Sequence, residues 1–181
     1  MRQVFKYLKA TQDLHLVLGG DNLNLMGYLD TDWASQMDCH SISGYAFYLG
    51  SGIISWSSKK QPIVTLSNTE SEQVALTHAA KELLWLRKLV IEVIQPVLSS
   101  LVLFCDNQGA ISLSKDTTFH AWTKHINTCF HFICQTINSK MAMLVYCSTN
   151  DMVADIFKKS LARPKLEKFC HLLGLRYLCP A

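Results

Sequence analysis

The sequence predicts an α/β fold in which helices flank a mixed β-sheet. Three observations predict it: three strand-like segments follow one another, a long amphipathic helix comes next, and short apolar strands then alternate with helices. Strands joined by short turns pair antiparallel, whereas strands separated by a helix usually join a sheet in parallel. The 181 residues, 49% hydrophobic and 17% charged, suit one globular domain with a substantial core.

The N-terminal third is rich in strand patterns. Residues 1–10 fit a short amphipathic helix, and residues 14–18 alternate weakly between apolar and polar. The segment LNLMGYLD (23–30) is apolar enough for a largely buried strand. In residues 44–57, apolar side chains alternate on both sides of a Gly-Ser-Gly turn, which is typical of a hairpin. We therefore expect three antiparallel strands in a row.

The helical period begins at residue 67. Ser67 and Glu70, and also Thr69 and Glu72, have the spacing of a capping box, and apolar residues then recur at helical intervals as far as Val90. Residues 101–106 and 142–148 are short apolar strands, and residues 107–115 and 124–137 fit helices between them. The segment 150–161 predicts a C-terminal helix that breaks at Pro164 and resumes beyond it.

Four acidic residues stand at the ends or starts of these elements: Asp30, Glu72, Asp106 and Asp155. Acids at strand ends and helix starts can converge at one edge of a sheet. Clustered carboxylates repel one another unless a cation lies between them, and oxygen ligands favour Mg²⁺ or Mn²⁺. Two such ions about 4 Å apart can activate water and stabilise the leaving oxygen of a phosphodiester.

Each acid also has a simpler interpretation. Asp106 fits the N-cap of the helix that follows it, Glu72 fits a capping-box partner, and Asp155 fits a solvated helix residue. Asp30 or Asp32 fits a turn. A zinc site is a further alternative, because three histidines and two cysteines cluster within 15 residues: His120, His125, Cys129, His131 and Cys134. A second ligand pair at standard spacing is missing from that run, which favours core packing instead.

Several stretches, in order, resemble the ribonuclease H domain of Ty1/copia-type retrotransposon Pol polyproteins, of the kind found in plants. They are GYLDTDWAS, SGYAFYLGSGIISWSSKKQPIV, SNTESEQVAL, KELLWLRKL, FCDNQGAISLSKD, FHAWTKHI and NDMVADIFKKSL, spread over residues 25–175. The resemblance implies a ribonuclease H-like fold with a mixed five-stranded sheet over residues 21–178. Residues 1–20 resemble the segment that links such a domain to the reverse transcriptase polymerase.

The resemblance also implies a function. The implied activity is metal-dependent endonucleolytic cleavage of the RNA strand of an RNA–DNA hybrid. The two Mg²⁺ or Mn²⁺ ions would be held by four acids, each of which matches a family position: Asp30, Glu72, Asp106 and Asp155. Asp32 becomes a turn residue. Basic side chains would contact the phosphates of the hybrid, and the candidates are Lys59, Lys60, Lys124 and His125.

The chain departs from the family pattern at several positions. Trp122 and Cys134 stand where the family usually has arginine, Ser160 where it has proline, and His40, Ile42 and Gln73 also differ. Arginine-to-tryptophan and similar changes are those expected when methylated cytosines decay. The alternative hypothesis is thus a degenerate, catalytically inactive fragment, with Met1 a chance start, that at most binds nucleic acid.

The expected setting is intracellular. No apolar run reaches the length of a membrane span, and seven cysteines without a C-x-x-C motif suit a reducing compartment. The net charge of +3 permits a polyanionic partner. The resemblance places the chain in a reverse transcriptase polyprotein, in cytoplasmic virus-like particles or in the nucleus.

Overall fold

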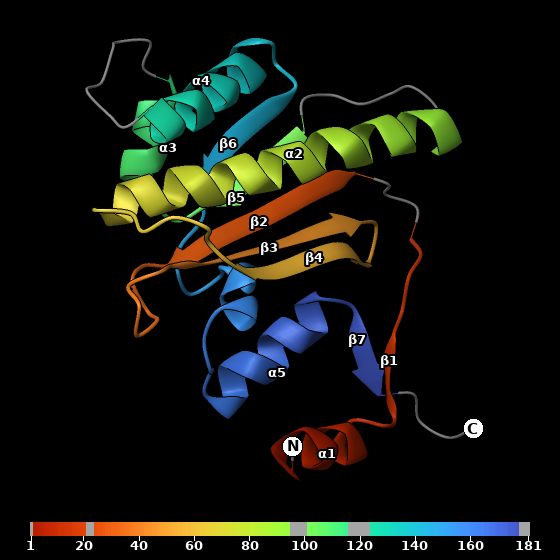
Figure 1. Ribbon diagram of the computed structural model, residues 1–181. Helices are drawn as coiled ribbons and strands as arrows, with labels where there is room; N and C mark the ends of the chain where they lie inside the picture. The colour runs from red at the N-terminus through yellow and green to blue at the C-terminus, as the bar shows by residue number, and fades with distance from the viewer. Residues whose placement is uncertain (1, 21–23, 95–100, 116–123, 178–181) are drawn as a thin grey trace.

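A computed structural model describes residues 2–20, 24–94, 101–115 and 124–177, and the side chains of 94 and 124–126 fall outside that description. Its centre is a five-stranded sheet with the strand order β4-β3-β2-β5-β6. Three helices cover one face of this sheet, and a short 3₁₀ helix and one α-helix cover the other (Figure 1). The predicted mixed sheet with flanking helices is confirmed.

The first three strands of the sheet form an antiparallel meander. They are β2 (Leu25–Asp32), β3 (Ile42–Leu49) and β4 (Gly52–Lys60). Strands β5 (Leu101–Cys105) and β6 (Ala142–Tyr146) then add in parallel on the other side of β2. This arrangement follows from the connections, because the hairpin turns are short while helices separate β4 from β5 and β5 from β6.

The main core lies between the sheet and three helices: α2 (Asn68–Ile94), α3 (Gln108–Lys115) and α4 (Lys124–Asn138). Leu29 and Phe47 from the sheet and Leu76 and Leu83 from α2 are fully buried there. In the strands, alternate residues point to this face, so Leu29 faces α2 while its neighbours Tyr28 and Asp30 face the opposite side. The alternation therefore directs the Asp30 carboxylate away from the main core.

The opposite face is covered by η1 (Val153–Phe157), a short 3₁₀ helix, and α5 (Arg163–Leu172). The predicted helix over residues 150–161 is wrong, since only this five-residue turn forms there. Pro164 lies in the first turn of α5 and does not interrupt a helix. A proline in the first turn loses no intrahelical hydrogen bond, so it favours a helix start.

The N-terminal segment lies beside the C-terminal end of the described chain (Figure 1). Helix α1 (Arg2–Ala10) agrees with the sequence prediction, and within the described chain none of its residues is buried. Strand β1 (Leu14–Leu16) pairs antiparallel with β7 (Leu175–Tyr177), which the sequence did not predict. None of the helices in the described ranges is long and apolar enough to cross a membrane.

Candidate metal centre

Asp30 and Asp106 are brought together by the pairing of two parallel strands. Tyr28 of β2 lies opposite Phe104 of β5. Two residues further along each strand, on the same face, the chain reaches Asp30 and Asp106. Asp30 is still within β2 and 2% exposed, whereas Asp106 follows the last residue of β5 and is half-buried. The sheet thus places one carboxylate inside and one nearer the solvent.

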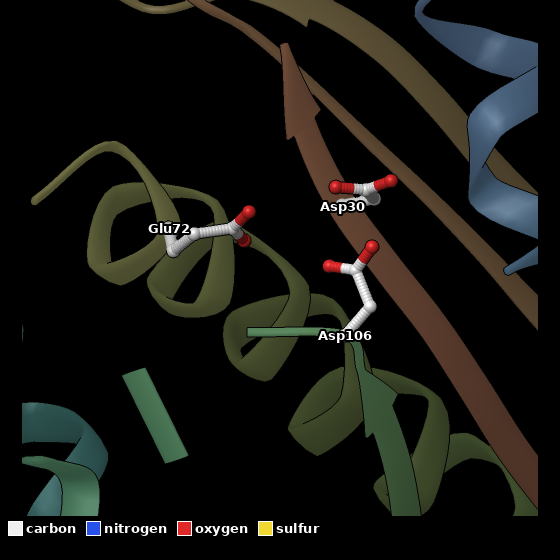
Figure 2. Close-up of side chains that lie close together, drawn as sticks. All are labelled: Asp30, Glu72 and Asp106. Carbon is white, nitrogen blue, oxygen red and sulfur yellow. The ribbon is translucent and has the colours of Figure 1, made fainter. Parts of the chain in front are cut away.

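Glu72 comes from the first turns of α2 and does not cap that helix. The capping box is formed by Ser67 and Glu70: the Glu70 carboxylate accepts a hydrogen bond from the Leu66 N–H at 2.8 Å, and Ser67 Oγ accepts one from the Glu70 N–H at 3.2 Å. The alternative in which Glu72 serves as a capping partner is therefore wrong. Its carboxylate is instead directed toward the ends of β2 and β5 (Figure 2).

Asp106 is likewise not a helix cap. The first turn of α3 is capped by Asn107, whose Oδ1 accepts a hydrogen bond from the Ala110 N–H at 2.9 Å. Asp106 Oδ2 accepts a hydrogen bond from Thr149 Oγ1 at 2.9 Å, which orients the carboxylate from the loop after β6. The simpler interpretation of Asp106 as an N-cap is wrong, and its carboxylate is available for another role.

Asp30, Glu72 and Asp106 form a three-carboxylate cluster at the end of the sheet (Figure 2). One oxygen from each lies within 4.8 Å of the others, and among the described residues this is the one grouping of acids, histidines and cysteines with that geometry. Glu72 is 2% exposed, and its Oε2 finds no hydrogen-bond partner among the described groups. A buried carboxylate oxygen without a partner is costly unless a cation binds it.

Burial and mutual repulsion shift the pKa values of two of these acids. Desolvation is the main cause that raises the pKa of Glu72, and the charges of Asp30 and Asp106 raise it further. Desolvation also raises the pKa of Asp30, to about 7, although the nearby Lys158 ammonium opposes the shift. Both shifts express the same physics: three acids held together disfavour full ionisation in the absence of a bound cation.

Asp155, the fourth predicted acid, lies beside Asp30 but outside the three-carboxylate cluster. It is fully buried, so the alternative of a solvated helix residue is wrong. Lys159 Nζ lies 2.8 Å from its Oδ1 and Lys165 Nζ lies 2.8 Å from its Oδ2. Burial opposes ionisation, but hydrogen bonds from Asp30 and these lysines outweigh it and lower the pKa of Asp155.

Lys158 is the functional candidate that sequence reasoning missed. It follows η1, and its Nζ lies 2.5 Å from Asp30 Oδ2 and 3.4 Å from Asp155 Oδ1. The signal was present in the sequence, because Lys158 and Lys159 stand three and four residues after Asp155, the spacing at which a helical turn brings side chains together.

Of the other predicted residues, the structure describes the side chains of Asp32, Lys59 and Lys60. Asp32 is outside the cluster and is the last residue of β2, paired with Ile42, so its interpretation as a turn residue is wrong. Lys59 lines a hollow of about 170 Å³ together with His78 and Lys81 of α2, and Lys60 pairs with Asp38. The side chains of Lys124 and His125 lie outside the described residues, as do His120 and Trp122.

The zinc alternative gains no geometric support in the described part of the chain. Cys129 and Cys134 lie on α4, and neither belongs to a metal-binding group. Cys134 is buried, and its Sγ lies 3.4 Å from the carbonyl oxygen of Ser114 in α3. Gln73, another departure from the family pattern, is also buried and donates a hydrogen bond to the carbonyl of Ala110. Both residues therefore contribute to packing between α2, α3 and α4.

Comparison with known proteins identifies relatives along the whole chain. The Pol polyprotein of transposon TNT 1-94 from Nicotiana tabacum is 37% identical over 176 residues, 97% of this chain and 13% of that protein. The Pol polyprotein of transposon RE2 from Arabidopsis thaliana is 37% identical over 183 residues, which cover all of this chain. The chain belongs to the retrotransposon Pol polyproteins. It spans about an eighth of the length of these relatives, 13% in each case.

Solved structures agree on the fold of this Pol segment. A ribonuclease H1 isolated from compost, LC11-RNase H1, aligns with a TM-score of 0.56 and 14% identity over 75% of this chain and 93% of that protein. The same enzyme in complex with an RNA/DNA hybrid aligns with a TM-score of 0.54. The chain has a ribonuclease H-like fold. No protein-family model matches it.

Proposed function

We propose that this Pol segment is a ribonuclease H that hydrolyses the RNA strand of RNA–DNA hybrids endonucleolytically with the help of a divalent metal ion. The observation that carries the proposal is the three-carboxylate cluster of Asp30, Glu72 and Asp106 at the end of the sheet. Sequence relatives that are Pol polyproteins and a ribonuclease H-like fold support the same reaction class.

The cluster fits Mg²⁺ or Mn²⁺. Its donors are all carboxylate oxygens, which these hard cations prefer, and Glu72 Oε2 is a buried oxygen without a hydrogen-bond partner in the described chain. The half-buried Asp106 leaves one side of the cluster accessible to a substrate. When bound, the ion supplies Lewis acidity that polarises a phosphodiester and makes water a stronger nucleophile near neutral pH.

The residues around the cluster have distinct tasks in this proposal. Asp30 and Glu72 would hold the ion from the buried side, and Asp106 would hold it from the more exposed side. The hydrogen bond from Thr149 fixes the orientation of Asp106. Lys158 neutralises part of the negative charge next to Asp30, which lowers the repulsion between the acids and an incoming phosphate. Asp155 anchors the lysines in this position.

Recognition of the hybrid is assigned to basic side chains near the sheet edge. The complex of LC11-RNase H1 with an RNA/DNA hybrid supports the choice of ligand. Of the two predicted residues whose side chains the structure describes, Lys59 is the better placed, since it shares its hollow with Lys81 and His78. Lys60 is engaged by Asp38 and would have to leave that pair to meet a phosphate. We keep Lys124 and His125 as candidates from the sequence.

The wider setting is also part of the proposal. Residues 1–20 would link residues 21–178 to a reverse transcriptase polymerase within a polyprotein, in cytoplasmic virus-like particles or in the nucleus. Helix α1 fits a linking role because its apolar residues Val4, Phe5 and Leu8 remain exposed, at 60%, 68% and 55%.

Cleavage of a hybrid with a labelled RNA strand tests the proposal. With Mg²⁺ the wild-type chain should cut the RNA strand and leave the DNA strand intact. Asp106→Asn should abolish cleavage, and the matched control Asp32→Asn, changed at the same edge of the sheet but outside the cluster, should retain it. Equal activity of the Asp106→Asn variant and the wild type would point to a contaminating nuclease and refute the assignment.

A second candidate function is hybrid binding without turnover, as expected of a degenerate fragment. The position of Lys158 favours it, because an ammonium group next to Asp30 competes with cations for the same carboxylate. Hybrid binding that persists in EDTA, together with no cleavage in either Mg²⁺ or Mn²⁺, would favour this candidate. Cleavage that Asp106→Asn abolishes would exclude it.

A further inference from the structure

The space between Asp30 and Asp155 contains the ammonium group of Lys158. Besides its ion pairs with these two acids, at 2.5 Å and 3.4 Å, Nζ donates a hydrogen bond to the carbonyl oxygen of Thr31 at 2.8 Å. The Lys158 side chain is 6% exposed. This lysine is therefore part of the interior of the site, held by three oxygens from two elements.

The same two carboxylates would be needed to hold a second divalent ion. Asp30 belongs to the three-carboxylate cluster on one side and meets Asp155 on the other. An ion shared by Asp30 and Asp155 would lie about 2.0–2.5 Å from one oxygen of each. Lys158 Nζ is already 2.5 Å from Asp30 Oδ2, so the ammonium and a divalent ion exclude each other from this space.

Two further lysines complete the arrangement. Lys159 Nζ and Lys165 Nζ each lie 2.8 Å from an oxygen of Asp155, so three ammonium groups surround one buried carboxylate. The three ammonium groups already neutralise the negative charge of this carboxylate, so it does not require a metal ion as a counter-charge. Among the described residues, the ion pairs of the three-carboxylate cluster involve one cation, Lys158, and Glu72 Oε2 has no hydrogen-bond partner there.

We propose that Lys158 is a built-in cation that takes the place of a second metal ion between Asp30 and Asp155, so that the chain binds one divalent ion instead of two. The remaining ion belongs to the cluster of Asp30, Glu72 and Asp106. The inference rests on the proposed metal site of the preceding subsection, but it concerns the number of ions and needs no cleavage.

Counting bound Mn²⁺ on the purified full chain tests the inference, with electron paramagnetic resonance of free Mn²⁺ as the readout. The wild type should bind one ion per chain. Lys158→Gln removes the ammonium and should gain a second ion, bound at least about tenfold more tightly than any second ion in the wild type. Lys158→Arg retains the positive charge and should bind one.

Lys159→Gln is the matched control. It removes a lysine that contacts Asp155 but not Asp30, so it should leave the count at one. Circular dichroism establishes that each variant is folded, and the wild-type and Lys158→Arg counts remain informative if Lys158→Gln does not fold. Two tightly bound ions in the wild type, or one ion in folded Lys158→Gln, would overturn the inference while leaving the nuclease proposal intact. Zero ions in the wild type and in folded Lys158→Gln would refute the metal site itself.

Discussion

Replacement of Glu72 by glutamine should stabilise the metal-free protein and remove its response to metal. Glu72 is 2% exposed, and its carboxylate lies within 4.8 Å of those of Asp30 and Asp106. Two unit charges at this separation repel by about 3 kcal/mol at an effective dielectric constant of about 20. Lys158 and partial protonation offset part of this repulsion, so we expect a net gain of about 1–3 kcal/mol in the free energy of unfolding.

The gain should depend on pH in a defined direction. The pKa of Glu72 is raised above its ordinary value of 4.5, so the wild-type residue is neutral in the folded protein at low pH and costs little. As the pH rises from about 4.5 through the folded-state pKa of Glu72, the wild type loses the stability that this residue contributes, a loss that the glutamine variant lacks. The difference between the two proteins should therefore increase with pH.

Thermal unfolding in EDTA, followed by circular dichroism, measures the effect. For a chain of this size, about 1–3 kcal/mol corresponds to a rise in the melting temperature of about 2–12 °C. Excess Mn²⁺, at a hundred times the dissociation constant, should raise the free energy of unfolding of the wild type by about 3 kcal/mol and so raise its melting temperature. It should not raise the melting temperature of Glu72→Gln. Glu92→Gln, on the exposed face of the same helix, is the control and should change little. A destabilised Glu72→Gln variant with an intact Mn²⁺ response would refute the reasoning.

Three other predictions concern the surroundings of the cluster. Mn²⁺ affinity should increase between about pH 6 and about pH 8, because Asp30, with a pKa of about 7, must lose its proton to bind the ion. Titration calorimetry at several pH values checks this, and an affinity that does not change with pH contradicts it. Lys158→Gln should cleave hybrids at least about tenfold faster in a gel assay, because the second ion that it admits assists the reaction. Slower cleavage would count against Lys158 as a substitute for that ion. Gly44→Ala should lower the free energy of unfolding in urea by about 1–3 kcal/mol. The added Cβ would lie 3.0 Å from the carbonyl oxygen of Ala154 and 3.3 Å from Phe157 Cβ, and would push η1 away from β3. Unchanged stability would show that η1 moves freely.

Most of the fold was predictable because it depends on local periodicity. The alternation of Tyr45, Phe47 and Leu49 predicted β3, and the helical spacing after Ser67 predicted α2, which begins one residue later at Asn68. The segment 150–161 was not predictable in this way. Its apolar residues fit a helical period, but η1 is held against β2 and β3 by contacts that local sequence does not contain. Strand β7 has three residues and exists only as the partner of β1.

The site was predictable in its residue types but not in its grouping. Strand ends suggested Asp30 and Asp106, while sequence alone left the capping alternatives open. The structure decides between them because Glu70 and Asn107 supply the caps, which leaves the other acids available. Lys158 was missed because its importance depends on where a long, flexible side chain ends, and spacing along the chain gives only a weak indication of that.

Anomalous scattering from crystals of the wild-type chain can locate bound Mn²⁺ and so tests whether Asp30, Glu72 and Asp106 form a metal centre. One strong peak is expected within coordination distance of Asp30, Glu72 and Asp106, with Lys158 still in place between Asp30 and Asp155. A crystal grown with excess Mn²⁺ that shows no peak at these three carboxylates would contradict the claim that they form a metal centre.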